Sequence, residues 1–466
     1  MEKNDPESKI RKVVDACADC DICRYLMDTT CFLFPELYRL YDKELETGQK
    51  ITPQELRNLV DLCNFCAVCP CQNIRADIMT AKTAFIDRDG LRFSVRIIED
   101  VERIGRLCGA YPQLANFLFQ NKLTGSFLKK MAGIHQERKI PRFPKENFPT
   151  WVQRKNLHTK PSKKQKRKVA YFAGCTGRYF FPEVSRAAVE VFKNNGIEVY
   201  YPEQQCCGMP TLLEGDRQNT LQFAGFNVDR LAEAVKEGYD IVCSCPTCGY
   251  MLKNVLKEGA YYSAEYQAAV GADETYLKVP AETVKAASEE NKFVFLKKSI
   301  YEGILKDEGY FSSINPQKRV IVAEKVFDLG EYLRTLHSAG ELKAKLGPVH
   351  AHIAYYTPCH LREQNIGQPY LDLLGLIPGI LIEPIDGAFY CCGVAGIMGF
   401  KREFHKTSIK MGNGLIEKIK TINPEMLITD CLSCRLQFNQ LTSYKVLHPL
   451  EILKQSYMAG LANNDR

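Results

Sequence analysis

Residues 168–175 read KVAYFAGC, and residues 352–359 read HIAYYTPC. Each stretch is a short apolar run that ends in a cysteine, as expected of a buried β-strand that leads into a loop. A Cys-Cys-Gly triplet and then a Cys-x2-Cys pair follow both stretches in the same order. Corresponding cysteines are 184 positions apart at the first cysteine and 186 apart at the last pair. This shared order at a nearly constant offset predicts an internal duplication.

Each copy is expected to fold as an α/β unit. Residues 169–173 and 353–357 suit buried strands, and residues 182–195 have the apolar spacing of a helix that Gly196 would end. Residues 197–200 read as the next strand, and a strand, a helix and a strand in such short succession require parallel pairing. The cysteines of the two copies are Cys175, Cys206, Cys207, Cys245 and Cys248, then Cys359, Cys391, Cys392, Cys431 and Cys434.

The Cys-Cys-Gly triplets indicate a metal site larger than one ion. Adjacent cysteines direct their side chains apart, so they suit different irons of a cluster better than one tetrahedral zinc. The glycine that follows, Gly208 or Gly393, lets the backbone approach an inorganic core. A thioredoxin-like dithiol at Cys245 and Cys248 is the alternative, but it leaves the doublet and Cys175 unexplained.

The first hundred residues hold two further groups of cysteines. The first group is Cys17-x2-Cys20-x2-Cys23 with Cys31 further on, and the second is Cys63-x2-Cys66-x2-Cys69-Pro-Cys71. Three thiolates on one tight loop can hold three corners of an iron–sulfur cubane, and a distant cysteine can take the fourth. Zinc is the alternative, but a zinc site built from two pairs leaves the third cysteine of each triplet unused. Between the groups, residues 52–62 predict a capped helix.

This N-terminal pattern resembles the two-cluster helical ferredoxin domain of heterodisulfide reductase-related iron–sulfur proteins, the family that includes the C subunits of anaerobic glycerol-3-phosphate dehydrogenases. In that family the fourth cysteine of each motif binds the cluster of the other motif. The resemblance implies that Cys17, Cys20, Cys23 and Cys71 hold one 4Fe-4S cubane, and that Cys63, Cys66, Cys69 and Cys31 hold the other. The spacing departs from the family at Cys31, eight residues after Cys23, and at Cys71, two after Cys69.

The duplicated motif resembles the cysteine-rich CCG domain of the same family, which also occurs in glycolate oxidase iron–sulfur subunits. The five-cysteine motif is complete twice, and the resemblance implies one or two noncubane 4Fe-4S clusters bound by these ten cysteines. In heterodisulfide reductases such clusters cleave a disulfide.

Composition excludes several other classes of protein. Of the 466 residues 20 are cysteines, and with a polar, charged start we expect no secretory signal, a reducing compartment and no disulfide framework. No stretch is long and apolar enough to predict a membrane span. The formal net charge of +7 arises in residues 154–168, which carry eight basic residues and no acid. The remainder is close to neutral, so no nucleic-acid partner is expected.

Residues 101–168 predict helices followed by a basic linker. Apolar residues at helical spacing occur at Leu114, Phe117 and Leu118, and again at Leu123, Phe127, Met131 and Ile134. The favoured interpretation is a helix packed on its own core. The alternative is an interfacial or partner-docking helix, helped by nearby lysines.

Dinucleotide and nucleotide motifs are missing, so we expect no flavin or NAD on this chain. Iron–sulfur clusters carry single electrons, whereas a hydride donor needs a flavin to split the pair, which predicts a flavoprotein dehydrogenase partner. The expected function is an iron–sulfur electron-transfer subunit of an anaerobic oxidoreductase that passes electrons to a quinone, a membrane cytochrome or a disulfide. The alternative is that the chain is itself the disulfide reductase. The expected location is the cytoplasm, with the inner face of the cell membrane as a peripheral site.

The predicted fold class is α/β, with an all-helical ferredoxin-like domain over residues 1–100 and a duplicated CCG domain. A helical segment and linker occupy 101–168, the first repeat 169–255, a helical insertion and connection 256–350, and the second repeat 351–466. No catalytic residue is assigned: His360 and His448 are expected to orient loops. Cys108 is expected to be a buried apolar residue, and Cys243 a strand residue.

Overall fold

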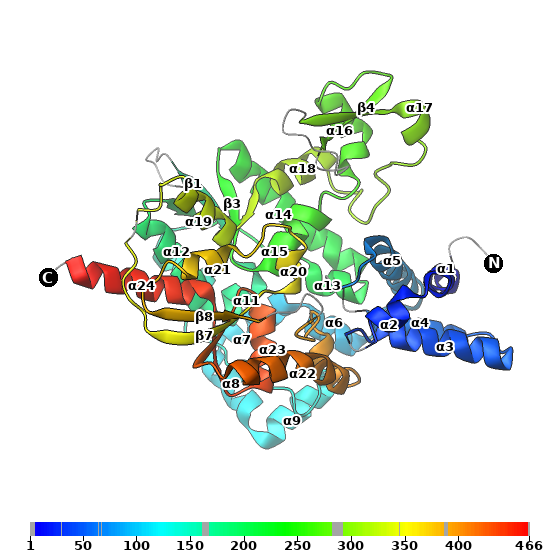
Figure 1. Cartoon of the computed structure of the whole chain (residues 1–466), viewed down its shortest axis with the longest axis horizontal. Coiled ribbons are helices and arrows are strands. Elements are labelled where there is room, and N and C mark those ends of the chain that lie inside the picture. The colour runs from blue at the N-terminus through cyan, green and yellow to red at the C-terminus, as the bar shows by residue number, and fades with distance from the viewer. Residues whose placement is uncertain are drawn as a thin grey trace.

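Two four-stranded parallel sheets form the centre of this computed structural model, which describes residues 5–28, 30–63, 65–66, 68–160, 167–281, 292–343, 345–385 and 390–464 (Figure 1). The first sheet has the order β2-β1-β3-β6, and the second has the order β8-β7-β9-β10. The two orders match strand for strand, so the predicted duplication and the α/β fold are confirmed. The strands are β1 (Lys168–Phe172), β2 (Glu198–Tyr200), β3 (Asp240–Cys243), β6 (Val326–Asp328), β7 (Ala351–Tyr356), β8 (Ile380–Pro384), β9 (Met426–Thr429) and β10 (Lys445–Leu447).

The central strands β1 and β7 are apolar because both of their faces are covered. Val169 and Tyr171 of β1 are fully buried, as are Ile353 and Tyr355 of β7. Helices pack on both faces of such parallel sheets and remove the alternation of polar and apolar residues. The helix expected over residues 182–195 is α12 (Pro182–Asn194). Gly196, the residue expected to end it, has a positive φ of 70°.

The two repeats pack on each other with approximate two-fold symmetry. In the first repeat α12 packs against α24 (Pro449–Asn464) of the second, and α19 (Leu329–Ser338) of the first packs against α21 (Pro369–Leu374) of the second. By position in the sheet order, α12 corresponds to α21 and α19 corresponds to α24. Each contact is therefore the counterpart of the other with the repeats exchanged.

Residues 256–350, predicted as a helical insertion and connection, contain helices and also strands. They contain an antiparallel hairpin of β4 (Tyr276–Pro280) and β5 (Phe293–Lys297), in which Leu277 pairs with Leu296. Strand β6 and helix α19, which follow, complete the first repeat rather than connect it to the second. The two strands, YLKVP and FVFLK, are short and apolar, and the surrounding Lys, Glu and Ala are typical of helices, so the hairpin is hidden in the sequence. Residues 282–291, within this segment, lie outside the described residues.

The helices of the two repeats and of the insertion are mostly short. They are α11 (Gly174–Tyr179), α13 (Met209–Glu214), α14 (Arg217–Lys236), α15 (Pro246–Tyr250), the π-helical turn η1 (Met251–Val255), the 3-10 turn η2 (Ala260–Tyr262), α16 (Ala264–Ala269), α17 (Lys298–Tyr301), α18 (Pro316–Glu324), α20 (Cys359–Arg362), the 3-10 turn η4 (Met398–Phe400), α22 (His405–Ile422) and α23 (Leu432–Leu441).

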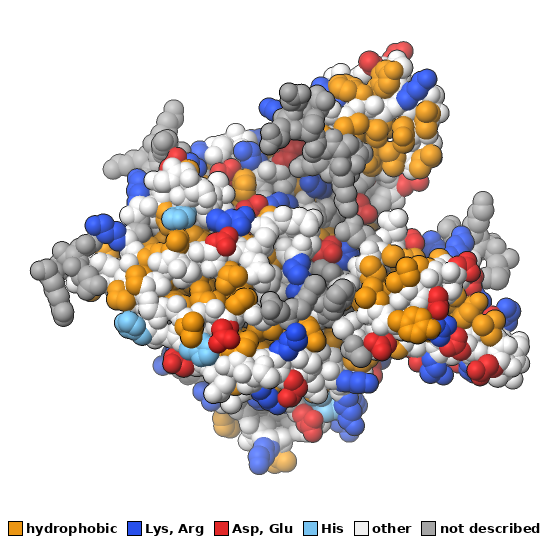
Figure 2. All heavy atoms as spheres, viewed as in Figure 1, with side chains coloured by type: hydrophobic (Ala, Val, Ile, Leu, Met, Phe, Trp, Pro, Cys, Tyr) orange, Lys and Arg blue, Asp and Glu red, His pale blue; other side chains and the backbone are white. Residues whose placement is uncertain are grey.

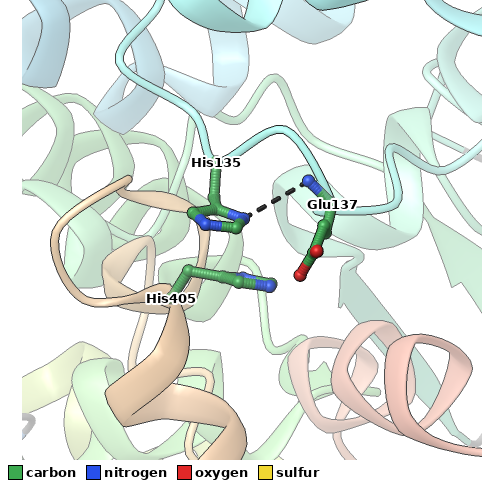
Figure 3. Close-up of side chains that lie close together, drawn as sticks. All are labelled: His135, Glu137 and His405. Atoms are coloured by element: carbon green, nitrogen blue, oxygen red, sulfur yellow. Dashed lines mark hydrogen bonds between the residues drawn. The ribbon is translucent and has the colours of Figure 1, made fainter.

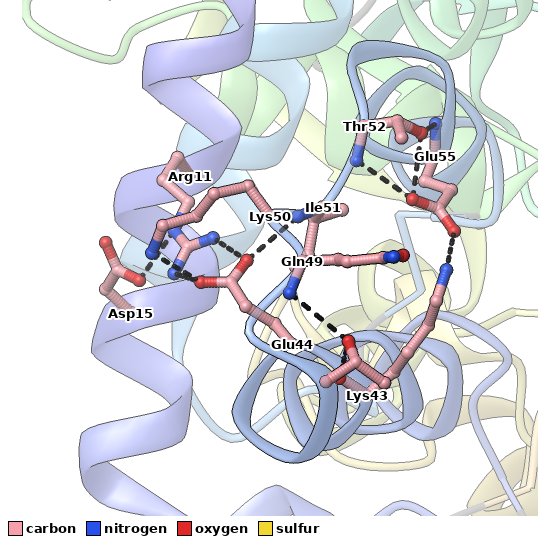
Figure 4. Close-up of polar contacts among 10 residues, drawn as sticks. Arg11, Asp15, Lys43, Glu44, Gln49, Lys50, Ile51, Thr52 and Glu55 are labelled. Atoms are coloured by element: carbon pink, nitrogen blue, oxygen red, sulfur yellow. Dashed lines mark hydrogen bonds and ion pairs between the residues drawn. The ribbon is translucent and has the colours of Figure 1, made fainter.

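The N-terminal region is helical, as predicted, and lies on the right of Figure 1. Its helices are α1 (Pro6–Cys20), α2 (Ile22–Leu26), α3 (Leu33–Thr47), α4 (Pro53–Asp61) and α5 (Gln72–Asp89). The predicted cap is confirmed, since Thr52 and Glu55 form a capping box at the start of α4 (Figure 4). The carboxylate of Glu44 on α3 holds this region together, because it accepts from Arg11 of α1, Lys50 and the N–H of Ile51 (Figure 4).

Residues 93–154 form five short helices: α6 (Phe93–Glu99), α7 (Val101–Ala110), α8 (Pro112–Gln120), α9 (Lys122–Met131) and α10 (Phe148–Arg154). The helical pattern over residues 114–134 is broken at Asn121, whose side chain accepts from the N–H groups of Leu123 and Thr124 and so starts α9. The prediction that this pattern packs on its own core is wrong for most of its residues. Only Ile134 of the set is buried, and Leu118 is half-buried. The exposed members are Leu114, Phe117, Leu123, Phe127 and Met131.

In the basic linker 154–168, residues 161–166 lie outside the described residues. Among the helices that the structure describes, none combines the length and the apolar character that a bilayer crossing needs.

Candidate metal centres

The first N-terminal group of cysteines gathers where α1 meets α2. Asp21 has a left-handed backbone with φ of 55°, which ends α1 and turns the chain directly into α2. Burial and the neighbouring thiols raise the pKa of Cys17 to about 12, and the neighbours with the largest influence are Cys23, Cys69 and Cys71, followed by Cys20. Cys71, from the start of α5, therefore lies beside the first triplet. Cys69 lies within the same reach of Cys17, so the ligand sets that the family pattern implies stay predictions.

The second N-terminal group has the reciprocal arrangement. Burial raises the pKa of Cys31, and the thiols that act on it most are Cys66 and Cys63 of the second triplet. Cys69 lies within electrostatic reach of Cys63 and Cys66, and also of Cys23 in the first group. The two groups are thus adjacent, and the assignment of each cysteine to one cluster stays a prediction.

The ten cysteines of the repeats follow the carboxyl ends of strands: the Cys-Cys doublets follow the edge strands β2 and β8, and the others follow central strands. Cys175 follows β1 and Cys245 follows β3, where it precedes α15. Cys359 and Cys431 have the same positions after β7 and β9. In open parallel sheets this edge is where ligands bind. The sheet topology, rather than the spacing in the sequence, brings the cysteines together.

The sulfurs of the first repeat form one connected line. Cys206 Sγ lies 3.5 Å from Cys175 Sγ. Cys207 hydrogen-bonds to Cys206 and Cys248, and these contacts lower its pKa to about 6. Cys248 in turn contacts Cys245. The thiolate is the form that binds metal, so a lowered pKa favours ligation.

The second repeat repeats this line. Cys359 hydrogen-bonds to Cys391, a contact that lowers its pKa to about 6. Cys392 contacts both Cys391 and Cys434, and Cys434 contacts Cys431.

Two further contacts join the separate groups into a single path. Cys245 of the first repeat hydrogen-bonds to Cys431 of the second. These two residues correspond to each other in the duplication, so they meet where the approximate two-fold axis passes. Cys391 of the second repeat interacts with Cys66 of the second N-terminal group. The order of the groups is therefore first triplet, second triplet, second repeat and first repeat.

These sites fit iron–sulfur clusters better than zinc. Each repeat supplies five thiols, one more than a tetrahedral zinc accepts, and no carboxylate belongs to either set. The backbone also approaches the sulfurs closely: a Cβ at Gly174 would lie 2.6 Å from Cys248 Sγ, and the N–H of Gly393 donates to Cys391 Sγ. Both glycines have positive φ, which the close approach requires. All twenty cysteines are described and none forms a disulfide.

Arg75 and His360 fasten the N-terminal cysteine loop to the repeats. The buried guanidinium of Arg75 donates to the carbonyl of Cys66, to Tyr250 and, at 2.8 Å, to Glu363. One ring nitrogen of His360 contacts the carbonyl of Phe65 and the other contacts the hydroxyl of Thr247 (residue 247 lies beside Cys248). Sequence analysis missed Arg75, because a single arginine in a helix carries no signal of its partners.

The remaining residues singled out from the sequence have structural positions. His448 is buried, and burial lowers its pKa to about 3, so it is neutral and accepts from the N–H of Leu450. Cys243 is the buried last residue of β3, as expected. Cys108 is half-buried rather than buried, because one side of it faces a cavity.

A buried arginine beside the second repeat also escaped sequence analysis. Arg138 is fully buried, donates to Gln437 and stacks on Phe400. Among the described residues its Nε and one of its terminal nitrogens have no hydrogen-bond partner. The charge that acts on it most is that of Cys392. In the sequence it stands between Glu137 and Lys139 and reads as part of a solvated charge run.

A cavity of about 430 Å³ reaches the sulfurs of both repeats. Cysteines of the two repeats and Cys66 line its inner end. Its outer walls come from α6, α7 and α9 and are almost wholly apolar, with Ile98, Ile104 and Leu128 among them. An apolar molecule can therefore approach the sulfurs without crossing a polar barrier.

His135, Glu137 and His405 form a separate cluster of metal-ligating types (Figure 3). The two imidazole rings stack with centroids 4.1 Å apart and planes 14° from parallel. A metal ion lies in the plane of each ring that binds it, so stacked rings cannot both bind one ion. His405 is also tied to the carbonyl of Gly399. The trio is a packing contact between the helical segment and α22.

The comparisons with known proteins agree with this arrangement. The family model for the CCG cysteine-rich domain matches residues 169–253 and 353–439, so the chain carries this domain twice. The C subunit of the anaerobic glycerol-3-phosphate dehydrogenase of Escherichia coli is 24% identical over 79% of this chain and 78% of its own length. The B subunit of the CoM/CoB fumarate reductase of Methanothermobacter marburgensis is 25% identical over 62% of this chain and 46% of its own length. Lactate utilization protein A of Bacillus pumilus is 25% identical over 61% of this chain and 98% of its own length.

Proposed function

Because the chain carries the CCG cysteine-rich domain twice and is related to subunits of oxidoreductases, we propose that it is an iron–sulfur electron-transfer subunit of an anaerobic multi-subunit oxidoreductase. It relays electrons between a flavoprotein dehydrogenase partner and a quinone, a membrane cytochrome or a disulfide. It works in the cytoplasm, peripherally at the inner face of the cell membrane.

The observation that carries the proposal is the single path of sulfur groups through the molecule. Two cubanes held by the N-terminal cysteines and one or two noncubane clusters held by the repeats would supply one-electron carriers along it. Because Cys66 contacts Cys391, electrons from the N-terminal cubanes would reach the second repeat before the first repeat. The contact between Cys245 and Cys431 joins the repeats to each other.

The chain's own residues position and insulate this path. Arg75 and His360 hold the second N-terminal loop against the second repeat through the backbone of residues 65 and 66. Nine of the ten motif cysteines of the repeats are buried and Cys359 is half-buried, so the protein covers most of their surface. The apolar cavity among the described residues offers an acceptor an approach to the sulfurs of both repeats.

Iron and acid-labile sulfide, measured after anaerobic purification, test the proposal. Four clusters require about 16 irons per chain, and two cubanes alone require about 8. A value near 16 supports clusters in both repeats, and a value near 8 restricts the relay to the N-terminal cubanes. Bound zinc with little iron contradicts the proposal.

A second candidate function is disulfide reduction by this chain itself. Both five-cysteine sets are complete, and the cavity leads to their junction at Cys245 and Cys431. The reaction would break one disulfide bond, consume two electrons and two protons, and release two thiols. The electrons would come from the bound clusters.

A single-turnover assay separates the two functions. The protein is reduced with dithionite, freed from excess reductant and mixed with a small disulfide, and the released thiol is measured. Thiol release that Cys391→Ser abolishes, with the cubane signals intact, supports the reductase. No release with any disulfide tested supports the relay alone.

A further inference from the structure

Helices α7, α8 and α9 present an unusual apolar surface, which we call the α7–α9 face. It is defined by Leu107, Leu114, Phe117, Leu123, Phe127 and Met131, whose side chains are 57% to 84% exposed. On α9 the three apolar residues are spaced four apart, so they lie along one side of the helix. We propose that this face docks the protein on an anionic lipid bilayer.

The charges within the segment that carries the face have one sign, and the exposed Glu137 follows directly after it. From Arg103 to Gln136 the chain contains five basic residues and no acidic residue. Arg103, Arg106, Lys122 and Lys130 are exposed. In Figure 2 the tip formed by α9 shows hydrophobic side chains beside Lys or Arg. Exposed apolar side chains interspersed with basic residues along the chain are the pattern of helices that lie in the interface of an anionic membrane.

A bilayer suits this face better than a protein partner does. Protein interfaces bury a compact core from which lysine is depleted. Here Lys122 precedes Leu123 in the chain and Lys130 precedes Met131. At a membrane surface such lysines extend their ammonium groups to lipid phosphates while the neighbouring apolar side chains enter the hydrocarbon. Each of the three helices has ten residues or fewer, so they can lie in the interface but not cross it.

The cavity opens on the same face. Leu107 and Met131 are exposed on the face and also line the cavity that ends at the sulfurs of the repeats. Docking in this orientation would place the mouth of the cavity against lipid. It would also turn the N-terminal cubane region, at another side of Figure 1, towards the water, where a partner can reach it.

The inference deepens the proposed function, because it states which side of the relay meets the membrane. Docking itself needs no electron transfer, so the two can fail separately. Iron content tests the clusters, and vesicle flotation tests the face.

The experiment uses the full chain, purified anaerobically, and vesicles of phosphatidylcholine alone or with about 30% phosphatidylglycerol. We expect the wild type to float with the anionic vesicles and to release at high salt. Leu123→Ser with Phe127→Ser should lower the partition coefficient at least about tenfold, since both side chains lose their burial in lipid. Lys122→Glu with Lys130→Glu should lower binding to anionic vesicles by at least about tenfold.

A matched control lies on the insertion. Phe295 and Ile304 are 59% and 75% exposed but lie in the hairpin region, away from α9 (Figure 1). Phe295→Ser with Ile304→Ser should float like the wild type. Circular dichroism and iron content confirm that each variant is folded and loaded.

Two results would overturn the inference. The first is a wild type that floats with no vesicle, and the second is a Leu123→Ser, Phe127→Ser variant that floats like the wild type. If neither vesicle binds but that variant loses a co-purifying protein subunit, the face is a protein interface instead.

Discussion

Arg138 shows how a single residue can make two duplicated sites unequal. Its guanidinium is buried beside the second repeat without a carboxylate partner among the described residues, whereas near Cys175 of the first repeat Arg178 is paired with Glu102. A buried cation that lacks a paired anion stabilises negative charge nearby. The second site is therefore expected to accept an electron more readily than the first.

Replacing Arg138 with Gln removes this charge with little change of volume. We expect the reduction potential of the second-repeat site to fall, while the cubane potentials stay as they are. An anaerobic redox titration followed by electron paramagnetic resonance measures both. Arg138→Lys should largely keep the wild-type potential, and Lys139→Gln, at an exposed neighbour, is the matched control. A potential that is unchanged in Arg138→Gln would contradict the role.

Glu99 gives a pH dependence that does not involve the clusters. Burial, with help from the nearby Asp216, raises the pKa of Glu99 to about 10. The folded protein keeps this proton above pH 4.5, whereas the unfolded chain loses it. The stability that the protonated group contributes is therefore full at low pH and is lost as pH rises towards 10.

Glu99→Gln keeps the neutral shape at every pH. We expect the melting temperature of the wild type to fall more steeply than that of Glu99→Gln between about pH 6 and pH 9. Thermal unfolding by circular dichroism at matched iron content measures the two slopes. Glu203→Gln, at a carboxylate that is 76% exposed, should follow the wild type. Equal slopes for wild type and Glu99→Gln would refute the assignment.

At the scale of the element, α3 depends on one carboxylate near its C-terminal end. Glu44 accepts from Arg11 of α1, Lys50 and the N–H of Ile51, and the contact with Arg11 is the largest reason that its pKa is lowered to about 2. A lowered carboxyl pKa contributes stability that is present above the ordinary value near 4.5. That stability is lost as pH falls from there towards 2.

Glu44→Gln should therefore destabilise the N-terminal region at neutral pH by about 2 kcal/mol, since hydrogen bonds to a charged group are lost. The difference in the free energy of unfolding between wild type and variant should become smaller below about pH 4. Hydrogen exchange of α1 and α3 measures the effect locally. Glu36→Gln, at an exposed pair with Arg39, is the control and should change little. A difference in stability that stays constant down to pH 2 would show that the ion pairs of Glu44 with Arg11 and Lys50 do not stabilise this region.

Helices and strands that depend on residues close together in the sequence could be predicted. Thr52 and Glu55 determine a helix start together, and the run 169–173 is apolar because a central strand is buried on both faces. The β4–β5 hairpin could not be predicted, because its five-residue strands pair across a segment of mixed Lys, Glu and Ala. Strand β6 could not be predicted either. It has three residues, and its partner β3 lies on the other side of the insertion in the sequence.

At the scale of the whole molecule, the cysteine types and motifs could be predicted, but their order in space could not. The contact of Cys66 with Cys391 joins residues more than three hundred positions apart, and it depends on how three folded units pack. The same holds for Arg75 and Glu363. The sequence offers an interfacial helix over residues 114–134 only as an alternative, because helical spacing alone does not say whether an apolar stripe meets a core or the solvent.

Arg75 joins the N-terminal unit to the repeats, so its loss should separate them. Breaking a buried ion pair leaves a buried charge and costs about 3–5 kcal/mol. We expect Arg75→Ala to keep the iron content of the N-terminal unit but to slow reoxidation of its cubanes by an acceptor that acts at the repeats. Stopped-flow absorbance measures this rate. Lys420→Ala, in an exposed pair with Glu417, is the control. An unchanged rate in Arg75→Ala would show that the contact does not hold the path together.

The reciprocal packing of α12 on α24 and of α19 on α21 has a historical consequence. A homodimer of one ancestral repeat would bring its own copies of Cys245 and Cys431 together in the same way, with two identical half-sites. Such a dimer must accept every mutation twice. Fusion of the two genes lifts that constraint, and each half then diverges alone. Among the described residues the hairpin belongs to the first half only, and Arg138, without a carboxylate partner there, lies beside the second half. A difference in reduction potential between the two sites gives electron flow a direction. A fused chain can acquire this difference, whereas a symmetric homodimer cannot.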